Sequence, residues 1–307
     1  MQSETSRYQN FWGDVITKTK GFCTVLTKDD KLVMCRVKKS MYRQDERAKQ
    51  LVVGDKVLVR FSEQDKQGLI VEIATRKSIF QRGSAKDGPP RTMGANLDLV
   101  GIVLSVKQPD FKVNLLFRFL LAANLGKVKP LVIINKVDLA SKLEIDKVLT
   151  IIKSADLSYL LHSIDSHSSL LKLKACFKGK RVLLVGLSGV GKTSLLNHLF
   201  PVLNLKTGEI NLKISKGRHI TTLARMMCLE NDYQIIDTPG IKEFKPYVLN
   251  KNLIGQEFSP FSRFIGDCRI KDCQHLTEPV CGVKEAILAG KLLAEIHQSY
   301  QNIWETS

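Results

Sequence analysis

Three short motifs occur in this chain in an order that few folds can accommodate. NKVD stands at 135–138, GLSGVGKT at 186–193 and DTPG at 237–240. In nucleotide-binding α/β domains that carry all three, the glycine-rich loop comes first, DxxG follows and NKxD comes last. Here the cyclic order is kept, but the linear order is cut between DxxG and NKxD. The order therefore predicts a circularly permuted GTPase fold.

The glycine-rich segment matches GxxxxGK[ST] in full and lies between an apolar run at 182–185 and a helical pattern. That context is the one in which backbone N–H groups and a helix N-terminus bind phosphate. Lys192 is expected to reach the β- and γ-phosphates, and the Thr193 hydroxyl to bind Mg²⁺. The predicted nucleotide contacts of this loop are Gly186, Ser188, Gly189, Val190, Gly191, Lys192, Thr193 and Ser194.

The NKVD motif follows an apolar strand pattern at 131–134. In an open α/β sheet, ligands bind at the carboxyl ends of the strands. The Asp138 carboxylate can accept from guanine N1 and N2, a donor pair that adenine lacks. Asn135 can bond the base edge or brace the phosphate loop, while the stem of Lys136 can cover the base. The motif therefore favours GTP and GDP over adenine nucleotides.

DTPG follows the apolar pattern at 234–236, where a magnesium-binding carboxylate belongs. Asp237 is expected to hold Mg²⁺, and the Gly240 amide to contact the γ-phosphate. The GRHITT segment at 217–222 lies where a switch I loop belongs. The residue after DxxG is Ile241, whose aliphatic side chain cannot orient water. His219 is therefore the candidate for that catalytic role, although a lone histidine is more often structural.

Three cysteines and one histidine fall within fourteen residues near the end of the chain. The spacing Cys268-x4-Cys273-x-His275-x5-Cys281 offers a Cys₃His set, which suits one tetrahedral structural Zn²⁺. Redox-active cysteines are the alternative.

Composition and pattern divide the chain into three parts. Short, evenly spaced strand patterns over residues 1–85 favour a five-stranded OB-type β-barrel that binds RNA. A basic stretch inside this part runs from Arg36 to Lys49 with Tyr42 among its residues; the alternative is a solvated loop. A linker rich in Gly and Pro spans 81–95. Residues 86–245 alternate apolar strands and helical patterns, as in a mainly parallel α/β sheet. Residues 246–307 form a mostly helical zinc-binding module, in which 283–304 is helical.

The chain carries a formal net charge of +17. This charge favours a polyanionic partner such as rRNA or the ribosome over an anionic membrane, with solubility as the plain alternative. No membrane span or signal peptide is evident, so a cytoplasmic protein is expected, working as a monomer.

Together, these features resemble the RsgA (YjeQ) family of circularly permuted GTPases. The resemblance covers the barrel, the permuted core and the zinc module. It includes TGEI at 207–210, GRHxTT, and CxxxxCxHxxExxC with Glu278 in place. It implies a GTPase that is stimulated by the 30S subunit, acts late in its maturation and contacts 16S rRNA.

The resemblance also assigns individual residues. It implies that His219 serves hydrolysis and that Thr221 is the switch I magnesium ligand, or Thr222 if the register is shifted by one. Ser163-Ile164 occupies the family's base-contacting Ser-Ala position, and the neighbouring His162, Asp165 and His167 are interpreted as loop residues. A GTP-dependent RNA-binding module without catalysis and a membrane-associated GTPase are the alternative functions.

Overall fold

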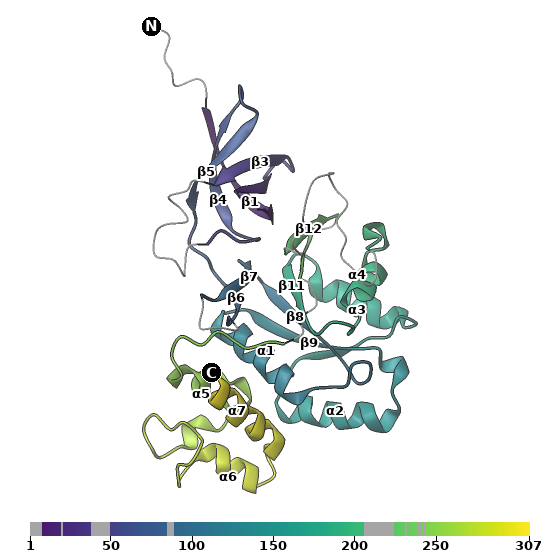
Figure 1. The fold of residues 1–307 in the computed structure, drawn as a ribbon. Helices are drawn as coiled ribbons and strands as arrows, with labels where there is room; N and C mark the ends of the chain where they lie inside the picture. Colours follow the sequence, from purple (N-terminus) through teal and green to yellow (C-terminus); the bar gives the residue numbers. More distant parts are fainter. Residues whose placement is uncertain are drawn as a thin grey trace.

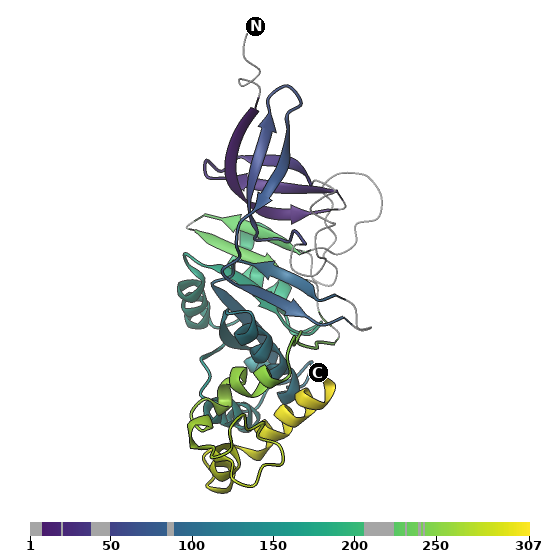
Figure 2. The same ribbon diagram turned by 90° about the vertical axis from the view of Figure 1, so that its left-hand side faces the viewer.

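A computed structural model describes residues 8–19, 21–37, 50–84, 89–205, 224–230, 232–238, 241 and 243–307. The molecule is elongated, with a β-barrel at one end, an α/β sheet in the middle and a helical module at the other end (Figures 1 and 2). Of the basic stretch from Arg36 to Lys49, Arg36 is described and exposed, whereas residues 38–49 lie outside the described residues.

Five strands form the barrel. They are β1 (Tyr8–Lys18), β2 (Phe22–Thr27), β3 (Leu32–Val37), β4 (Lys56–Ser62) and β5 (Gln67–Ile73). Strand β1 pairs with both β2 and β4, so the order β1-β2-β3-β5-β4 closes on itself. This is the closed Greek-key arrangement of an OB-fold. Its core consists of side chains that are almost completely buried, such as Val15, Val25, Val57 and Ile70.

The central sheet has the order β10-β9-β8-β11-β13-β12. Its strands are β8 (Leu99–Ser105), β9 (Lys129–Asn135), β10 (Tyr159–Leu161), β11 (Arg181–Val185), β12 (Arg225–Leu229) and β13 (Tyr233–Asp237). All neighbours are parallel except β12, which runs antiparallel to β13. The strand that leads into the phosphate loop, β11, is central, between the earlier β8 and the later β13. The strand that carries NKVD, β9, therefore precedes the phosphate-loop strand in the chain but lies in the same sheet, as the permuted motif order requires.

Helices cover both faces of this sheet. Their bounds are α1 (Val113–Leu125), α2 (Lys142–Ser154), α3 (His167–Phe177) and α4 (Lys192–Leu199). One hydrophobic core contains side chains of α1 and α2, and a second contains side chains of α3 and α4. Strand β8 contributes Ile102 to the first core and Val103 to the second, because successive strand residues point to opposite faces. The central part is therefore doubly wound.

The segment expected to be a linker is a hairpin. Strands β6 (Ile79–Arg82) and β7 (Arg91–Ala95) pair antiparallel, and Phe80 is fully buried. Its ring stacks on Phe244 at a centroid distance of 5.7 Å. The Gly and Pro residues mark the turn between the strands, whereas apolar packing orders the strands themselves. The boundary placed between residues 85 and 86 falls between the two strands and stays a prediction.

The C-terminal module contains α5 (Asn252–Glu257), α6 (Gly282–Leu288) and α7 (Ala294–Thr306). The helical stretch expected at 283–304 is two helices, because Gly290 adopts a φ of +68° between them. Tyr300 of α7 is fully buried in the same hydrophobic core as α1. Phe258 likewise contacts Phe117 of α1, with ring centroids 5.3 Å apart. The module is thus packed directly on the central part.

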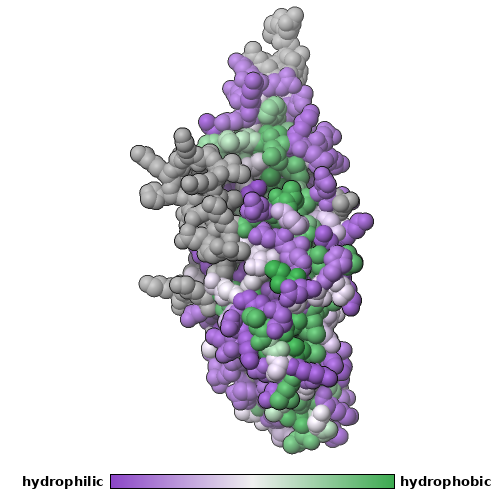
Figure 3. All heavy atoms as spheres, turned by 90° about the vertical axis from the view of Figure 1, so that its right-hand side faces the viewer, coloured by the Kyte–Doolittle hydropathy of each residue, from purple (hydrophilic) through white to green (hydrophobic). Residues whose placement is uncertain are grey.

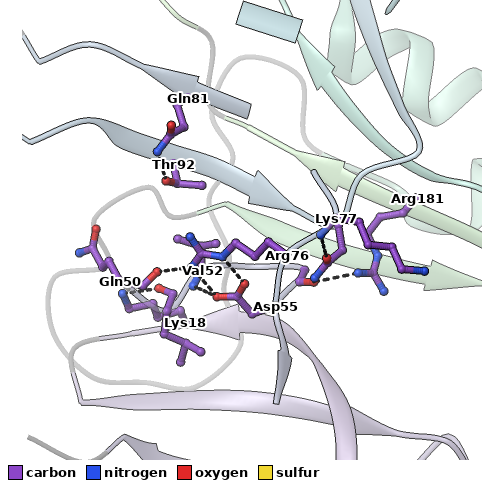
Figure 4. A network of polar contacts seen from close by, with 12 residues as sticks. Lys18, Gln50, Val52, Asp55, Arg76, Lys77, Gln81, Thr92 and Arg181 are labelled. Carbon is purple, nitrogen blue, oxygen red and sulfur yellow. Dashed lines mark hydrogen bonds and ion pairs between the residues drawn. The ribbon is translucent and has the colours of Figure 1, made fainter. Parts of the chain in front are cut away.

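A buried arginine joins the barrel to the central sheet (Figure 4). Arg181, the first residue of β11, donates from Nη1 to the Gly54 carbonyl at 2.8 Å and forms an ion pair with Asp14 at 3.1 Å. Its Nε donates to Gln234 at 2.9 Å. At the other end of the contact, Thr17 of β1 pairs with Arg225 of β12. Strand β1 therefore lies along the edge of the central sheet.

Within the described ranges, no helix is long and apolar enough to cross a membrane. On the face drawn in Figure 3, hydrophobic residues are interspersed with hydrophilic ones from the barrel to the C-terminal module.

Candidate nucleotide site and metal cluster

The phosphate loop joins β11 to α4 at the carboxyl end of the central sheet. Gly191 adopts a φ of +91°, and a Cβ atom there would lie 2.5 Å from Asn135 Nδ2. A Cβ atom on Gly186 would clash with the Val103 carbonyl. Only glycine allows the loop to pass this close to the neighbouring strands.

Lys192 and Asp237 form the charged centre of this site. The Lys192 ammonium donates to the carbonyls of Gly186 at 2.8 Å and Leu187 at 2.9 Å and is buried. Burial lowers the pKa of Lys192 to about 8, opposed by the charge of Asp237. Burial raises the pKa of Asp237 to about 6, opposed by Lys192. The two charges stabilise each other in a poorly hydrated place.

One oxygen of Asp237 identifies a place for a cation. Its Oδ1 is buried and has no hydrogen-bond partner among the described residues. A buried carboxylate oxygen without a donor is costly unless a cation or a water satisfies it. Thr193, the other magnesium ligand expected in the described chain, is half-buried in the first turn of α4. The donor set is of the oxygen type that Mg²⁺ prefers, so the residues fit that ion.

The NKVD residues hold the phosphate loop from the adjacent strand end. Asn135 Nδ2 donates to the Val190 carbonyl at 2.9 Å. Of its two expected roles, contact with the base edge and bracing of the phosphate loop, this bond corresponds to the second. The Lys136 ammonium donates to the carbonyls of Gly189 and Gln108, both at 2.7 Å. Asp138 lies in a short 3-10 helix, Val137–Leu139, and is exposed. Its carboxylate is therefore accessible to a base.

His162 lies in the loop directly after β10, as expected, but its side chain is buried. It is 2% exposed, and its Nδ1 lies 2.7 Å from Asn135 Oδ1. This contact was not predicted, because a single histidine in a sequence carries no sign of a partner 27 residues away. Ser163 is also buried and accepts from the Asp165 amide at 3.2 Å. Asp165 is in the loop as expected, whereas His167 is not and begins α3.

The region after DTPG contributes Ile241, which is 4% exposed. Its amide donates to the Gly186 carbonyl at 3.4 Å, and its carbonyl accepts from the Ser188 amide at 3.3 Å. The side chain thus packs in the core and its backbone is tied to the phosphate loop. Ser188 and Ser194 are exposed. The segments at 207–210 and 217–222, including His219, Thr221 and Thr222, and Gly240 lie outside the described residues.

The Cys₃His set comes together as a compact cluster. The ligand atoms of Cys268, Cys273, His275 and Cys281 all lie within 4.8 Å of one another. His275 Nδ1 is 3.5 Å from Cys268 Sγ and 3.4 Å from Cys281 Sγ. Tetrahedral zinc, with bonds of about 2.3 Å to sulfur and 2.0 Å to nitrogen, requires a sulfur–nitrogen separation of about 3.5 Å. The residues therefore fit a closed structural Zn²⁺ site.

Neighbouring side chains hold the loop that carries these ligands. The Glu278 carboxylate accepts from the amides of Gln274 at 2.7 Å and Leu276 at 2.8 Å. From α7, Tyr300 donates to the Gln274 carbonyl at 2.6 Å, and His297 Nε2 lies 2.6 Å from the His275 carbonyl. The sequence motif named Glu278, but it did not indicate His297 or Tyr300. Their spacing of three on one helix face was the available signal.

The fold and the site define a class of protein. A phosphate loop on the central strand, an aspartate on the next strand and a guanine-type motif that precedes both in the chain make this a circularly permuted GTPase. The chain belongs to the RsgA GTPase family, because the sequence model of that family matches residues 73–246.

Relatives cover almost the whole chain. The small ribosomal subunit biogenesis GTPase RsgA of Haemophilus influenzae (strain PittGG) is 31% identical over 300 residues, 96% of this chain and 84% of that protein. The protein of the same name from Alkaliphilus metalliredigens (strain QYMF) is 34% identical over 250 residues, 81% of this chain and 82% of its own.

Solved structures agree with this fold. YjeQ from Thermotoga maritima superposes with a TM-score of 0.75 at 26% identity, covering 97% of this chain and 98% of its own. YloQ, a circularly permuted GTPase, gives a TM-score of 0.72 at 25% identity, covering 99% and 97%. The predicted fold class, an OB-type barrel, a permuted α/β domain and a mostly helical C-terminal module, is confirmed.

Proposed function

We propose that this GTPase acts in the late maturation of the 30S ribosomal subunit, with hydrolysis stimulated by the subunit and driving release. The observation that carries the proposal is the joined site at 135–138, 186–193 and 237, placed between a barrel and a Cys₃His module. The relatives' names, which specify small ribosomal subunit biogenesis, support the choice of partner. The protein would act as a cytoplasmic monomer.

The nucleotide would lie along the carboxyl end of the central sheet. The amides of the phosphate loop and Lys192 bind the phosphates, and Asp138 accepts from the guanine base beside Ser163. Asn135 and Lys136 keep the loop closed through the Val190 and Gly189 carbonyls. Thr193, Asp237 and Thr221 would hold Mg²⁺, which neutralises charge on the phosphate oxygens when it is bound. Gly240 completes the γ-phosphate contacts.

Water has to be oriented by a residue other than Ile241. Its side chain is buried, and its backbone is tied to Gly186 and Ser188. His219, in the GRHITT segment that precedes β12 in the sequence, is proposed as the group that positions the water. The subunit would stimulate turnover by holding that segment against the nucleotide.

Two surfaces are proposed to contact 16S rRNA. On the barrel, the exposed Arg36 guanidinium lies over the Phe22 ring at 5.7 Å, a pair on which a base can stack. At the other end of the molecule, Arg269, Lys271 and Lys284 lie close in the sequence to the proposed zinc ligands. The net charge of +17 supports a polyanionic partner.

Turnover of GTP and ATP, each with and without purified 30S subunits, tests this function. GTP alone is expected to be hydrolysed, at least tenfold faster with subunits. His219→Ala is expected to bind GTP normally and to lose most of the stimulated rate. The Asp138→Asn variant serves as the specificity control, because an amide pairs with xanthine better than with guanine. Hydrolysis unaffected by 30S subunits would contradict the proposed function.

A further inference from the structure

Two histidines form a polar chain behind the NKVD motif. His162, directly after β10, places Nδ1 2.7 Å from Asn135 Oδ1 and Nε2 3.3 Å from Nδ1 of His198. His198 lies on α4, the helix that begins at the phosphate loop. The chain therefore joins the end of β9 to the helix that follows the phosphate loop, by way of His162.

The hydrogen bonds define which way each side chain in this row, Asn135, His162 and His198, is oriented. The Val190 carbonyl can only accept, so Asn135 must direct its Nδ2 donor toward it. Asn135 Oδ1 then faces His162 and can only accept. His162 must consequently carry a proton on Nδ1. In the neutral ring Nε2 is left as an acceptor, which the Nδ1–H of His198 satisfies.

The environment favours this neutral form. His162 is 2% exposed, and burial followed by the neighbouring His198 lowers its pKa to about 4, with Asp138 acting in the opposite direction. A neutral imidazole has one donor and one acceptor, which matches the two partners. With the ring neutral, only the tautomer protonated on Nδ1 satisfies Asn135, because Asn135 Oδ1 needs a donor.

We propose that His162 is a positioning residue for the nucleotide site, which fixes the Asn135 amide and through it the phosphate loop. Without the Nδ1 donor, Asn135 Oδ1 is buried with no partner, and the amide is free to rotate away from the Val190 carbonyl. The loop then loses the brace nearest to Gly191. His198 assists by holding the ring of His162 in its tautomer. This inference rests on the proposed guanine-nucleotide site.

The test compares dissociation of N-methylanthraniloyl-GDP from full-length wild type, His162→Leu and His162→Asn. Asparagine keeps a donor near the position of Nδ1, whereas leucine has none, and both remove the ring. Losing one buried hydrogen bond corresponds to an increase of roughly five- to tenfold in the release rate. His162→Leu is expected to show this increase, and His162→Asn to stay within about twofold of wild type. Equal rates for His162→Leu and wild type, or for the two variants, would overturn the proposal.

A second measurement needs no substitution and no nucleotide. Two-bond ¹H–¹⁵N spectra of the histidine rings report which nitrogen carries the proton. At pH 7, His162 is expected to show a protonated Nδ1 and a bare Nε2. A ring protonated on Nε2 alone, or on both nitrogens, contradicts the inference even in a protein that folds and binds normally. If wild type fails to bind the GDP probe, the proposed nucleotide site is wrong, and the ring spectrum still decides the role of His162.

Discussion

At Gly191 the phosphate loop passes so close to the Asn135 side chain that there is no room between them for a methyl group. The Gly191 φ of +91° is unfavourable for other residues, and an added Cβ would lie 2.5 Å from Asn135 Nδ2. Gly191→Ala is therefore expected to displace Asn135 and to weaken GDP binding at least tenfold, measured by calorimetry.

The matched control for this change is Gly179→Ala. Gly179 also has a positive φ, +68°, but a Cβ there meets no atom within 4 Å. Its substitution costs only the backbone conformation, about 1 kcal/mol of unfolding free energy, and should leave GDP affinity unchanged. Equal effects of the two substitutions on affinity would show that Asn135 is not in steric contact with the loop.

The buried His162 also predicts how stability depends on pH. Its pKa is lowered to about 4 in the folded protein, whereas the unfolded chain titrates near 6.5. Between these values the unfolded state binds more protons, so this contribution to stability is present above pH 6.5 and is lost as the pH falls toward 4. Wild type should lose about 2 kcal/mol relative to His162→Asn over this range, measured by urea unfolding. If the unfolding free energies of wild type and His162→Asn change with pH in parallel, this prediction is wrong.

At the level of elements, sequence pattern was most informative where strands are buried on both faces. The apolar run before the phosphate loop predicted β11, which is buried throughout. Strand β1 is harder to predict, because its first three residues are exposed and polar residues interrupt its apolar alternation. The hairpin β6–β7 was missed because its Gly- and Pro-rich turn dominates the local composition. The link between Asn135 and His162 depends on pairing of β9 with β10, which no local pattern encodes.

The C-terminal module carries the Cys₃His cluster that is proposed to bind Zn²⁺. Zinc chelation is expected to increase hydrogen exchange across residues 265–290 while β8, β9 and β11 stay protected, because a bound ion would tie four residues of this loop together. Mass spectrometry of deuterium uptake with and without chelator checks this. Uniform protection in both states would mean that the ligands hold no structural metal.

Glu278 gives a sharper test of the same element. Its two carboxylate oxygens each accept a hydrogen bond from a backbone amide beside His275, a proposed zinc ligand. Glu278→Gln keeps the size but replaces one acceptor oxygen by an NH₂ group, which cannot accept, so one bond is lost and zinc affinity should fall about tenfold. Competition with a chromogenic chelator measures it. Lys284→Gln, which alters a neighbouring bond to the Glu278 carbonyl, provides the control and should have a smaller effect.

At the scale of the whole molecule, the barrel is anchored by a few specific bonds. Arg181 is 9% exposed and connects Gly54 and Asp14 of the barrel to Gln234 of the central sheet. Arg181→Met should lower the unfolding free energy by about 2–3 kcal/mol, since it leaves the Gly54 carbonyl and Asp14 without this partner. It should also expose the 74–78 connection to proteases. Lys107→Met, which breaks an exposed ion pair with Glu144, should change neither stability nor cleavage. If Arg181→Met resists proteases as wild type does, the anchoring role is wrong.

The packing of α7 on α1 has a consequence for the synthesis of the chain. Domains generally fold in order as they leave the ribosome, and the five barrel strands all lie in the first quarter of the sequence. The core around α1, by contrast, contains Tyr300 and Ile303 of the last helix. During synthesis, the face of α1 that packs against α7 therefore stays uncovered until translation is nearly finished. A stop codon a few residues early would leave the first-made half of that core without its final layer.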